Sequence, residues 1–245
     1  MLSPLATGVS AALGTAAALG LAAGGFAYAS RWPGSRLFGE ALIAPQRPGE
    51  LALTFDDGPN AIWTPRLLDI LASHGVKATF FLLGSRAEAE PTLARRIVAE
   101  GHLIGNHSWS HVDLSLTAAP RMREEMLKCK KAIEQISGTP VKFFRPPFGA
   151  RRPAVLRAAR ELGMTPVLWN AMTTDWKEPS AEKIAARMER KIGRLQQHGR
   201  AANIVLHDGS HSDVAANRGP SVDAVERLIL RYRDTHRFVT LDAWS

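Results

Sequence analysis

The ten residues LALTFDDGPN, Leu51–Asn60, decide the fold of this chain. Their opening apolar run predicts a buried β-strand, and Gly58-Pro59 predicts a turn directly after Asp56 and Asp57. Neighbouring side chains at a strand end point to opposite sides, so we expect the two aspartates to meet different environments. One carboxylate can then bind a metal ion while the other moves protons. Asp-Gly is also ordinary turn chemistry, so the choice between these interpretations depends on the rest of the chain.

Segments typical of strands and helices alternate from Leu51 to the C-terminus. Strands are predicted at residues 51–55, 77–83, 102–105, 141–144, 166–170, 203–206 and 238–241, and helices at 64–73, 91–100, 117–136, 153–162, 180–197 and 222–233. Thr64, Thr117 and Ser180 are predicted to cap helices, and Gly138 to end one. This alternation predicts a parallel α/β sheet with helical crossovers. No glycine-rich phosphate loop follows the first strand, which argues against dinucleotide binding.

The first thirty residues, Met1–Ser30, carry no charged side chain and are dominated by Ala, Gly and Leu. A stretch of this length can span a bilayer, so we expect an N-terminal apolar helix that serves as a membrane anchor or uncleaved signal segment. A cleaved signal peptide is the alternative, because Ala27-Tyr28-Ala29 offers a cleavage pattern. No basic residue precedes the apolar run, which argues against cleavage. Residues 31–50 are expected to form a linker, and residues 51–245 the catalytic domain.

The sequence leaves the orientation of this anchor open. Arg31 and Arg36 follow the apolar run, and the positive-inside rule would then place the main domain in the cytoplasm. The high content of Ala and Gly weakens that inference. Our expectation is membrane association with the catalytic domain on the periplasmic or extracellular side.

The composition limits the possible partners. The net charge of +8 and the pI of about 10.1 are compatible with nucleic acid, lipid headgroups or a wall polymer. The Lys and Arg residues are scattered without interleaved aromatic residues, so we do not expect nucleic-acid binding. The single cysteine, Cys129, rules out an internal disulfide framework and a cysteine-rich zinc site.

Polar residues follow five of the predicted strands. They are Asp56 and Asp57, residues 106–111, residues 145–149, Asp175 and Trp176, and His207 and Asp208. In a β/α barrel these strand ends share one face, where catalytic residues collect. His107 and His111 lie four residues apart, so both imidazoles can reach one ion, although this spacing alone is often incidental. Adding Asp57 gives three protein ligands and open positions, as in a catalytic metal site.

Five motifs taken together resemble a known family. In order along the chain, TFDDGP, HSWSH, RPPFGA, DW and LHD are similar to the motifs of polysaccharide deacetylases with a NodB-homology domain, carbohydrate esterase family 4. The resemblance covers roughly residues 51–245. It implies a distorted (β/α) barrel, here of about seven parallel strands. It also implies hydrolysis of N- or O-acetyl groups on sugars.

The resemblance also implies a role for each motif residue. Asp57, His107 and His111 would bind one divalent metal ion, for which we expect Zn²⁺ ahead of Co²⁺, Ni²⁺ or Mn²⁺. Asp56 would be the general base with Arg145 as its partner, and His207 would be the general acid, tuned by Asp175. Substrate contacts would come from Pro147, Phe148, Trp176 and Leu206, with Trp176 and Leu206 around the acetyl methyl group. Phe148 stands where the motif often has Tyr, and its implied oxyanion contact uses the backbone N–H.

These features favour a metal-dependent hydrolase that removes N-acetyl groups from amino sugars of a cell-envelope polysaccharide such as peptidoglycan or a chitin-like polymer. We expect the catalytic domain to be monomeric. One alternative is a deacetylase or deformylase of a lipid-linked sugar, or an O-acetyl xylan esterase, with the same site. The other is a non-catalytic binding module, which the complete set of ligand and base residues argues against.

Overall fold

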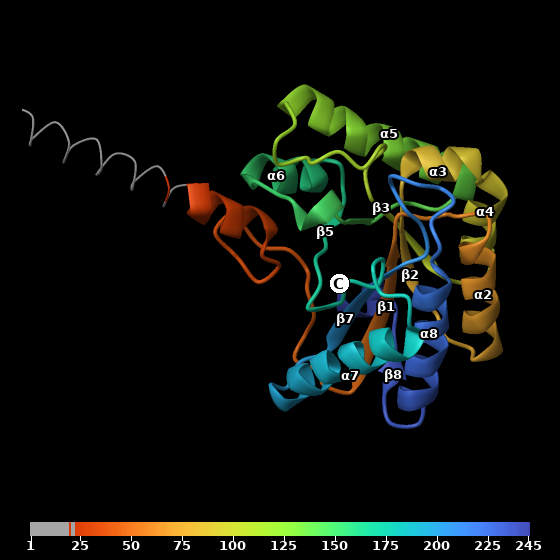
Figure 1. The fold of residues 1–245 in the computed structure, drawn as a ribbon. Coiled ribbons are helices and arrows are strands. Elements are labelled where there is room, and N and C mark those ends of the chain that lie inside the picture. Colours follow the sequence, from red (N-terminus) through yellow and green to blue (C-terminus); the bar gives the residue numbers. More distant parts are fainter. Residues whose placement is uncertain (1–19, 21–22) are drawn as a thin grey trace, which may run out of the picture.

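In the computed structural model, which describes residue 20 and residues 23–245, a curved parallel sheet carries helices on its outer side (Figure 1). Within the described residues the sheet has eight strands in the order β5-β4-β3-β2-β1-β7-β6, with β8 paired to β1. The strands are β1 Glu50–Asp56, β2 Thr79–Leu82, β3 Leu103–Asn106, β4 Phe143–Phe144, β5 Thr165–Pro166, β6 Ala171–Met172, β7 Ala202–His207 and β8 Arg237–Phe238. The prediction of a parallel α/β fold is confirmed.

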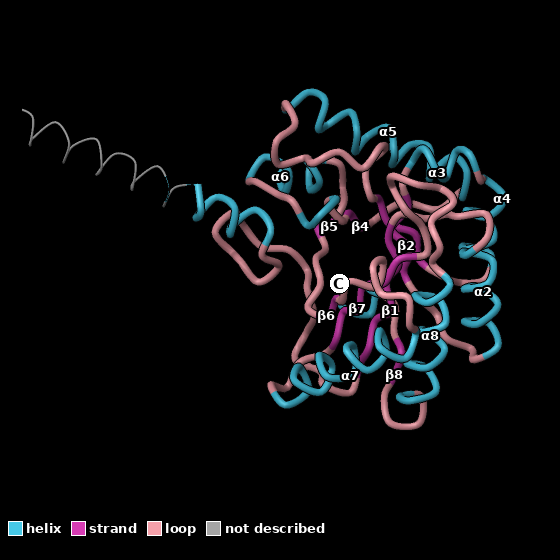
Figure 2. Tube along the Cα trace, viewed as in Figure 1, coloured by secondary structure: helices cyan, strands magenta, loops and turns pink. Residues whose placement is uncertain are grey.

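The helices link these strands, as predicted from the alternation (Figure 2). They are α2 Trp63–Ser73, α3 Gly84–Ala89, α4 Pro91–Ala99, α5 Ala119–Ser137, α6 Pro153–Glu161, α7 Ala181–Gln197 and α8 Gly219–Tyr232, with short 3-10 turns at Pro147–Gly149 and Leu241–Trp244. Six of the helices were predicted, and α3 was not.

The predicted helix ends are right at two positions and wrong at two. Ser180 caps α7 by accepting the N–H of Lys183, and Gly138 ends α5 with φ +66°. Thr64 does not cap α2, because it lies inside the helix. The side-chain oxygen of Asn60 accepts the N–H groups of Ile62 and Trp63 at the start of α2 instead. Thr117 does not cap α5, since its hydroxyl donates to the carbonyl of Asp113.

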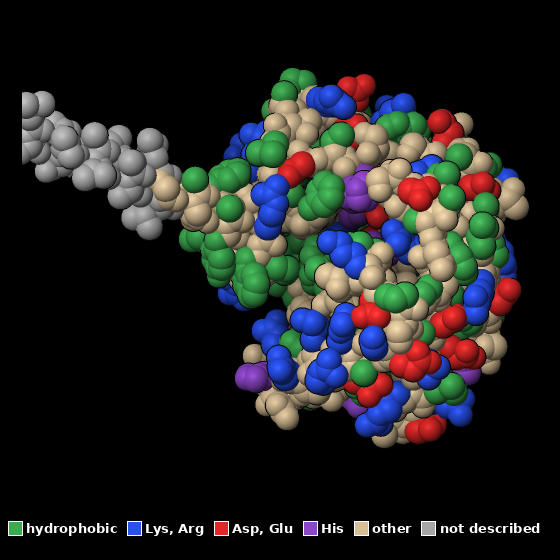
Figure 3. Space-filling model, viewed as in Figure 1, with side chains coloured by type: hydrophobic (Ala, Val, Ile, Leu, Met, Phe, Trp, Pro, Cys, Tyr) green, Lys and Arg blue, Asp and Glu red, His purple; other side chains and the backbone are tan. Residues whose placement is uncertain are grey.

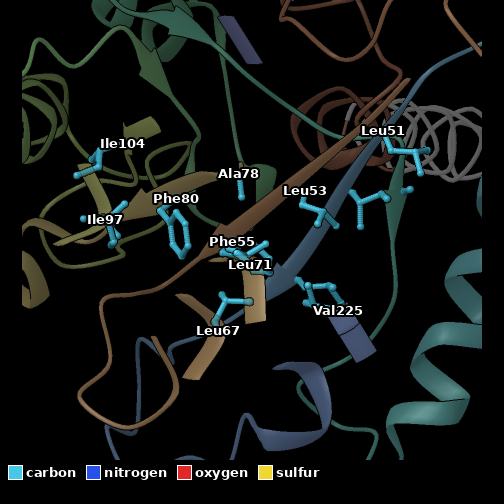
Figure 4. Packing of buried hydrophobic residues seen from close by; sticks show 14 of the residues in the cluster. Leu51, Leu53, Phe55, Leu67, Leu71, Ala78, Phe80, Ile97, Ile104 and Val225 are labelled. Carbon is cyan, nitrogen blue, oxygen red and sulfur yellow. The ribbon is translucent and has the colours of Figure 1, made fainter. Parts of the chain in front are cut away.

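Strand β1 is the centre of the sheet and is buried along its whole length. Its side chains alternate between two faces, so Leu51, Leu53 and Phe55 pack into the main hydrophobic core. Figure 4 shows Phe55 close to Leu67 and Leu71 of α2. Thr54 and Asp56 lie on the other face of the strand. Asp56 pairs in register with His207 of β7 and Phe81 of β2, so the carboxyl ends of these strands meet at one level.

The sheet curves like a barrel, but β5 and β6 stand at its two edges and do not pair with each other. The strand predicted over residues 166–170 is wrong, since β5 ends at Pro166 and β6 begins only at Ala171. The N–H of Leu168 donates to the carbonyl of Leu42, and the N–H of Leu42 donates to the carbonyl of Pro166. The chain around Leu42 thus supplies the backbone partner at the point where β5 ends.

Most of the apolar helix predicted over Met1–Ser30 lies outside the described residues. Residues 23–31 are helical. In the part of the chain that the structure describes, no helix combines the length and the apolar composition needed to cross a bilayer. The division into anchor, linker and catalytic domain stays a prediction. Residues 30–45 are hydrogen-bonded to the catalytic domain at several points, including Ser30 to Arg151 and Leu42 to Leu168.

Candidate active site

The two aspartates after β1 both line one cavity, which differs from the expectation that they would point to opposite sides. Asp57 has φ +72°, and this left-handed backbone conformation turns the chain so that its carboxylate stays beside that of Asp56. The turn is packed tightly against the chain after β7. A Cβ on Gly209 would lie 2.2 Å from the carbonyl oxygen of Asp57, so only glycine fits there.

Arg145 holds the Asp56 carboxylate from behind. Its Nη1 donates to Asp56 Oδ1 at 2.8 Å and to Thr54 Oγ1 at 2.8 Å, and its Nη2 donates to Asn203 Oδ1 at 3.3 Å. The guanidinium is fully buried and lies over the Phe81 ring. Burial lowers the pKa of Arg145, while the attraction of Asp56 opposes that change. A buried charge needs such a partner, as the sequence analysis expected for Arg145 and Asp56.

Asp57, His107 and His111 come together as the sequence predicted. All three are buried, and one ligand atom of each lies within 4.8 Å of the others. Asp57 Oδ1 is 3.2 Å from Nε2 of His111 and 3.6 Å from Nε2 of His107. His107 Nδ1 lies 2.8 Å from the carbonyl oxygen of Arg145, which fixes the ring and leaves Nε2 facing the carboxylate.

These three residues fit a divalent cation. Asp57 Oδ1 is buried and has no hydrogen-bond donor among the described residues, and a cation would complete its surroundings. Burial raises the pKa of Asp57, but the hydrogen bond from His211 and the nearby His111 and His107 outweigh it and hold that pKa well below its usual range. Burial, followed by the charge of His107, lowers the pKa of His111 to about 3. An ionised carboxylate with a neutral imidazole is the donor set that metal binding requires.

His207, which lines the same cavity, forms a second pair with Asp175. The Nδ1 of His207 lies 3.0 Å from Oδ1 of Asp175, and Ser221 Oγ donates to the same carboxylate at 2.7 Å. Burial by itself lowers the pKa of His207, but the charge and hydrogen bond of Asp175 outweigh it and raise that pKa to about 9. The imidazole is therefore protonated at neutral pH, as a general acid must be.

The cavity between these groups has a volume of about 340 Å³ and opens at the surface, where Figure 3 shows a hollow with histidine side chains. Its wall combines the charged groups above with aromatic and small polar side chains. The lining residues are Asp56, Asp57, His107, His111, Pro146, Phe148, Trp169, Met172, Trp176, Val205, His207, Ser210, His211, Ser212 and Arg218. The ring of Trp176 lies across that of His207 with centroids 5.0 Å apart.

Two of the predicted substrate-contact residues do not line this cavity. Leu206 is fully buried in the main hydrophobic core, because alternation along β7 places Val205 and His207 on the cavity side and Leu206 on the other. Pro147 is also buried, and its neighbour Pro146 lines the cavity instead. Phe148 and Trp176 do line it.

Sequence reasoning missed His211. Its ring stacks on that of His111 with centroids 3.9 Å apart, and its Nδ1 lies 3.4 Å from Oδ2 of Asp57. Asp208 was placed at this strand end but was given no role; its carboxylate accepts the hydroxyl of Thr64, and burial raises its pKa to about 7. The sequence feature that indicates further site residues here is the run of mostly polar residues 207–213, which follows an apolar strand.

Fold and site together have the arrangement of a hydrolase site: three residues that could hold a metal ion, a carboxylate held by Arg145 and a histidine held by Asp175. The family model described as polysaccharide deacetylase matches residues 44–167. The chain belongs to this family, which confirms the resemblance seen in its motifs.

Known relatives agree with that assignment. A peptidoglycan-N-acetylglucosamine deacetylase of Bacillus cereus is 37% identical over 202 residues, covering 82% of this chain and 70% of the relative. A chitooligosaccharide deacetylase of Sinorhizobium fredii is 36% identical over 188 residues, covering 74% of this chain and 85% of the relative. A crystal structure of a peptidoglycan N-acetylglucosamine deacetylase in complex with 4-naphthalen-1-yl-N-oxidanyl-benzamide superposes with a TM-score of 0.73 at 36% identity, covering 82% of this chain and 90% of that one.

Proposed function

We propose that this protein is a metal-dependent deacetylase that removes N-acetyl groups from amino sugars of a cell-envelope polysaccharide. The observation that carries the proposal is the presence, in one cavity, of a carboxylate held by Arg145 and an imidazolium held by Asp175. Amide hydrolysis needs both a base for the attacking water and an acid for the leaving amine. Two named relatives that act on N-acetylated glucosamine polymers or oligomers support the substrate class.

Asp57, His107 and His111 would hold the metal ion. When bound, a divalent ion lowers the pKa of water and polarises the acetyl carbonyl. We expect Zn²⁺ ahead of Co²⁺, Ni²⁺ or Mn²⁺, because imidazole nitrogen with a carboxylate oxygen suits zinc.

The two protonic roles follow from the surroundings of each group. Asp56 Oδ1 is occupied by Arg145, so Oδ2 is the atom that accepts the proton of the attacking water. His207 Nδ1 faces Asp175, so Nε2 is the atom that gives a proton to the leaving amine nitrogen. Arg145 lies behind Asp56 and holds the orientation of this carboxylate at the cavity.

The remaining residues hold the acetyl group. The N–H of Phe148 donates to the carbonyl oxygen as it gains negative charge. Phe148 has φ +58°, and the N–H groups of Gly149 and Ala150 donate to the carbonyls of Pro146 and Pro147, which fixes this turn at the cavity. Trp176 and Val205 form the apolar surface beside His207 that accepts the acetyl methyl group.

The test is acetate release by the purified full-length chain loaded with Zn²⁺. N-acetylglucosamine oligomers, peptidoglycan and acetylated xylan are compared, with free amine measured alongside acetate. We expect acetate and amine in equal amounts from the N-acetylated substrates. The matched control is His198→Ala, a surface histidine away from the cavity, which should retain full activity. Acetate from xylan alone would replace the proposal by an O-acetyl esterase, and no release from any glycan would leave a lipid-linked sugar as the substrate to test.

Three further properties belong to this proposal. Membrane association through residues 1–30 and a catalytic domain on the periplasmic or extracellular side are supported by the uncharged N-terminal stretch and by an envelope substrate. A monomeric catalytic domain is expected, because all site residues come from one chain. Fractionation of cells and light scattering of the purified protein test these properties.

A further inference from the structure

The N-terminal part of the described chain exposes an unusual number of large hydrophobic side chains. Phe26, Tyr28, Trp32 and Leu37 are 39%, 52%, 60% and 71% exposed, and they make up four of the ten exposed large hydrophobic residues in the part of the chain that the structure describes. We name residues 26–37 the aromatic segment. The rings of Tyr28 and Trp32 stack with centroids 6.2 Å apart. Clustered apolar exposure of this kind marks an interaction surface.

Helix α7 exposes a row of basic side chains. Its members are Lys183, Arg187, Arg190, Lys191 and Arg194, all exposed, and we name them the basic stripe. Their spacing of three to four residues places them along one side of the helix. Within the described residues only one member has a carboxylate within reach, Arg187 with Glu178 at 2.9 Å. The acid Glu182 of the same helix pairs with Arg227 of α8 instead.

The aromatic segment and the basic stripe lie on the same side of the molecule. Figure 3 shows hydrophobic side chains over the N-terminal segment and Lys and Arg side chains over α7 along one side, and Figure 1 places both elements there. The chain between them is tied to the end of α7, since Arg200 donates to the carbonyl of Ala44 at 3.0 Å and the N–H of Ala201 donates to that of Pro45 at 3.0 Å.

The aromatic segment is also fixed relative to the cavity. Arg31 pairs with Asp113, two residues after His111, and the buried Arg151 donates to the carbonyls of Ser30, Trp32 and Ser35. Arg151 follows directly on the turn that carries Phe148. Whatever binds the aromatic segment therefore sets the orientation of the catalytic cavity.

We infer that this side of the protein docks on an anionic lipid bilayer, with the aromatic segment at the level of the headgroups and the basic stripe on the membrane surface. Trp and Tyr prefer the membrane–water interface, and clustered Lys and Arg are attracted to anionic lipids. The uncharged stretch Met1–Ser30 runs directly into the aromatic segment. An anionic polymer would match the basic stripe but leave the exposed aromatic rings without a partner. The inference does not depend on the proposed activity.

The test uses the full-length protein with vesicles of phosphatidylcholine, alone or mixed with phosphatidylglycerol. Leu37→Cys labelled with an environment-sensitive fluorophore reports insertion, and Leu230→Cys, an exposed leucine on α8, is the matched control. The native Cys129 is fully buried, so the label is directed to the introduced cysteine. We expect a blue shift at position 37 on the mixed vesicles and none at position 230. The triple variant Arg187→Gln/Arg190→Gln/Arg194→Gln should lose at least about tenfold of the preference for the mixed vesicles.

A triple variant on α5, Arg121→Gln/Lys128→Gln/Lys131→Gln, removes the same charge elsewhere and should keep that preference. Equal fluorescence at positions 37 and 230, or an unchanged lipid preference in the α7 variant, would overturn the inference, because residues before the aromatic segment would then hold the membrane alone. Binding of a soluble polyphosphate without any shift at position 37 on vesicles would make the partner an anionic polymer and overturn it as well.

Discussion

His207 and Asp175 form a hydrogen-bonded pair in which the Nδ1–Oδ1 distance is 3.0 Å and the pKa of the imidazole is raised to about 9. Asp175 is itself buried and held by Ser221. A group with a raised pKa keeps its proton below that pKa and loses it as the pH rises through it. The protonated acid that the proposed mechanism needs is therefore present at neutral pH and is lost only under alkaline conditions.

The first prediction concerns the pH profile. Asp175→Asn removes the charge that raises the pKa of His207, so that pKa should fall toward or below its ordinary value. The alkaline limb of kcat/KM, expected near pH 9 in the native protein, should move down by at least about one unit. A profile from about pH 6 to about pH 10 on an N-acetylated oligomer measures it. Asp242→Asn, a surface change, serves as the control, and an unmoved alkaline limb in Asp175→Asn would remove His207 from the acid role.

The second prediction separates the base from the acid. Asp56→Asn keeps the size of the side chain and removes the base, so turnover should fall by about 100- to 10,000-fold on both an N-acetyl sugar and an activated aryl acetate. His207→Ala should lose as much on the amide and much less on the aryl acetate, whose leaving group departs without a proton. Steady-state kinetics of both variants on both substrates decide the matter. Equal losses for His207→Ala would point to binding or oxyanion stabilisation.

The third prediction concerns the metal. His107→Ala and His111→Ala should each lose bound metal and activity while the melting temperature stays close to that of the metal-free native protein, because the hydrophobic core does not include these side chains. Metal content by elemental analysis and thermal unfolding are measured together. Chelation should inactivate the native protein, and added Zn²⁺ should restore it. His198→Ala is the matched control, and stoichiometric metal in either cavity variant would refute the ligand assignment.

The strand ends and the candidate metal ligands could be predicted from sequence because the relevant signals are local. Apolar runs give the strands, and polar residues directly after them fall at the same edge of a parallel sheet. The motif spacing then selects Asp57, His107 and His111, and these residues do come together. Thr54 and Asn203 are polar residues within apolar strands, which is a weaker indication of a role at the site. In the structure both accept hydrogen bonds from Arg145.

Other features depend on contacts between distant parts of the chain. The apolar run after Pro166 looks like one continuous strand, but residue Leu42, far away in sequence, takes the place of a sheet neighbour there. Val205 and Leu206 are neighbours in β7, so their side chains point to opposite faces of the sheet. A motif position does not fix which of the two faces the cavity. His211 reaches Asp57 only through the fold of the chain after β7. No local pattern encodes these contacts.

The fourth prediction tests whether Val205 or Leu206 faces the cavity. Leu206→Ala should destabilise the protein by about 2–5 kcal/mol, because it leaves a hole in a fully buried core, and should keep kcat/KM close to native in the folded fraction. Val205→Phe fills part of the cavity and should lower kcat/KM by at least about tenfold with a smaller effect on stability. Denaturant unfolding and kinetics of the two variants measure both effects. The reverse pattern would place Leu206 at the substrate.

The fifth prediction concerns Arg151, which ties the N-terminal segment to the catalytic domain. Its guanidinium is fully buried and donates to the backbone carbonyls of Ser30, Gly149, Trp32 and Ser35, and in the described part of the chain no carboxylate pairs with it. Arg151→Met keeps the length of the side chain but removes its hydrogen bonds to these four carbonyls, so the free energy of unfolding should fall by about 1–3 kcal/mol. Arg152→Met changes the neighbouring arginine and is the matched control.

Removal of the N-terminal residues tests the same contacts from the other side. Deletion of residues 1–22 leaves every carbonyl that Arg151 contacts, so stability and activity should stay close to native. Deletion of residues 1–35 removes three of the four, and it should destabilise the domain at least as much as Arg151→Met. It should also raise the KM for glycan, because the turn that carries Phe148 lies next to Arg151 in the chain and shares its hydrogen bonds through Gly149. If both deletions unfold at the native denaturant concentration with native KM, residues 31–35 are part of a linker, as the sequence predicts for residues 31–50, and Arg151 does not position the catalytic turn.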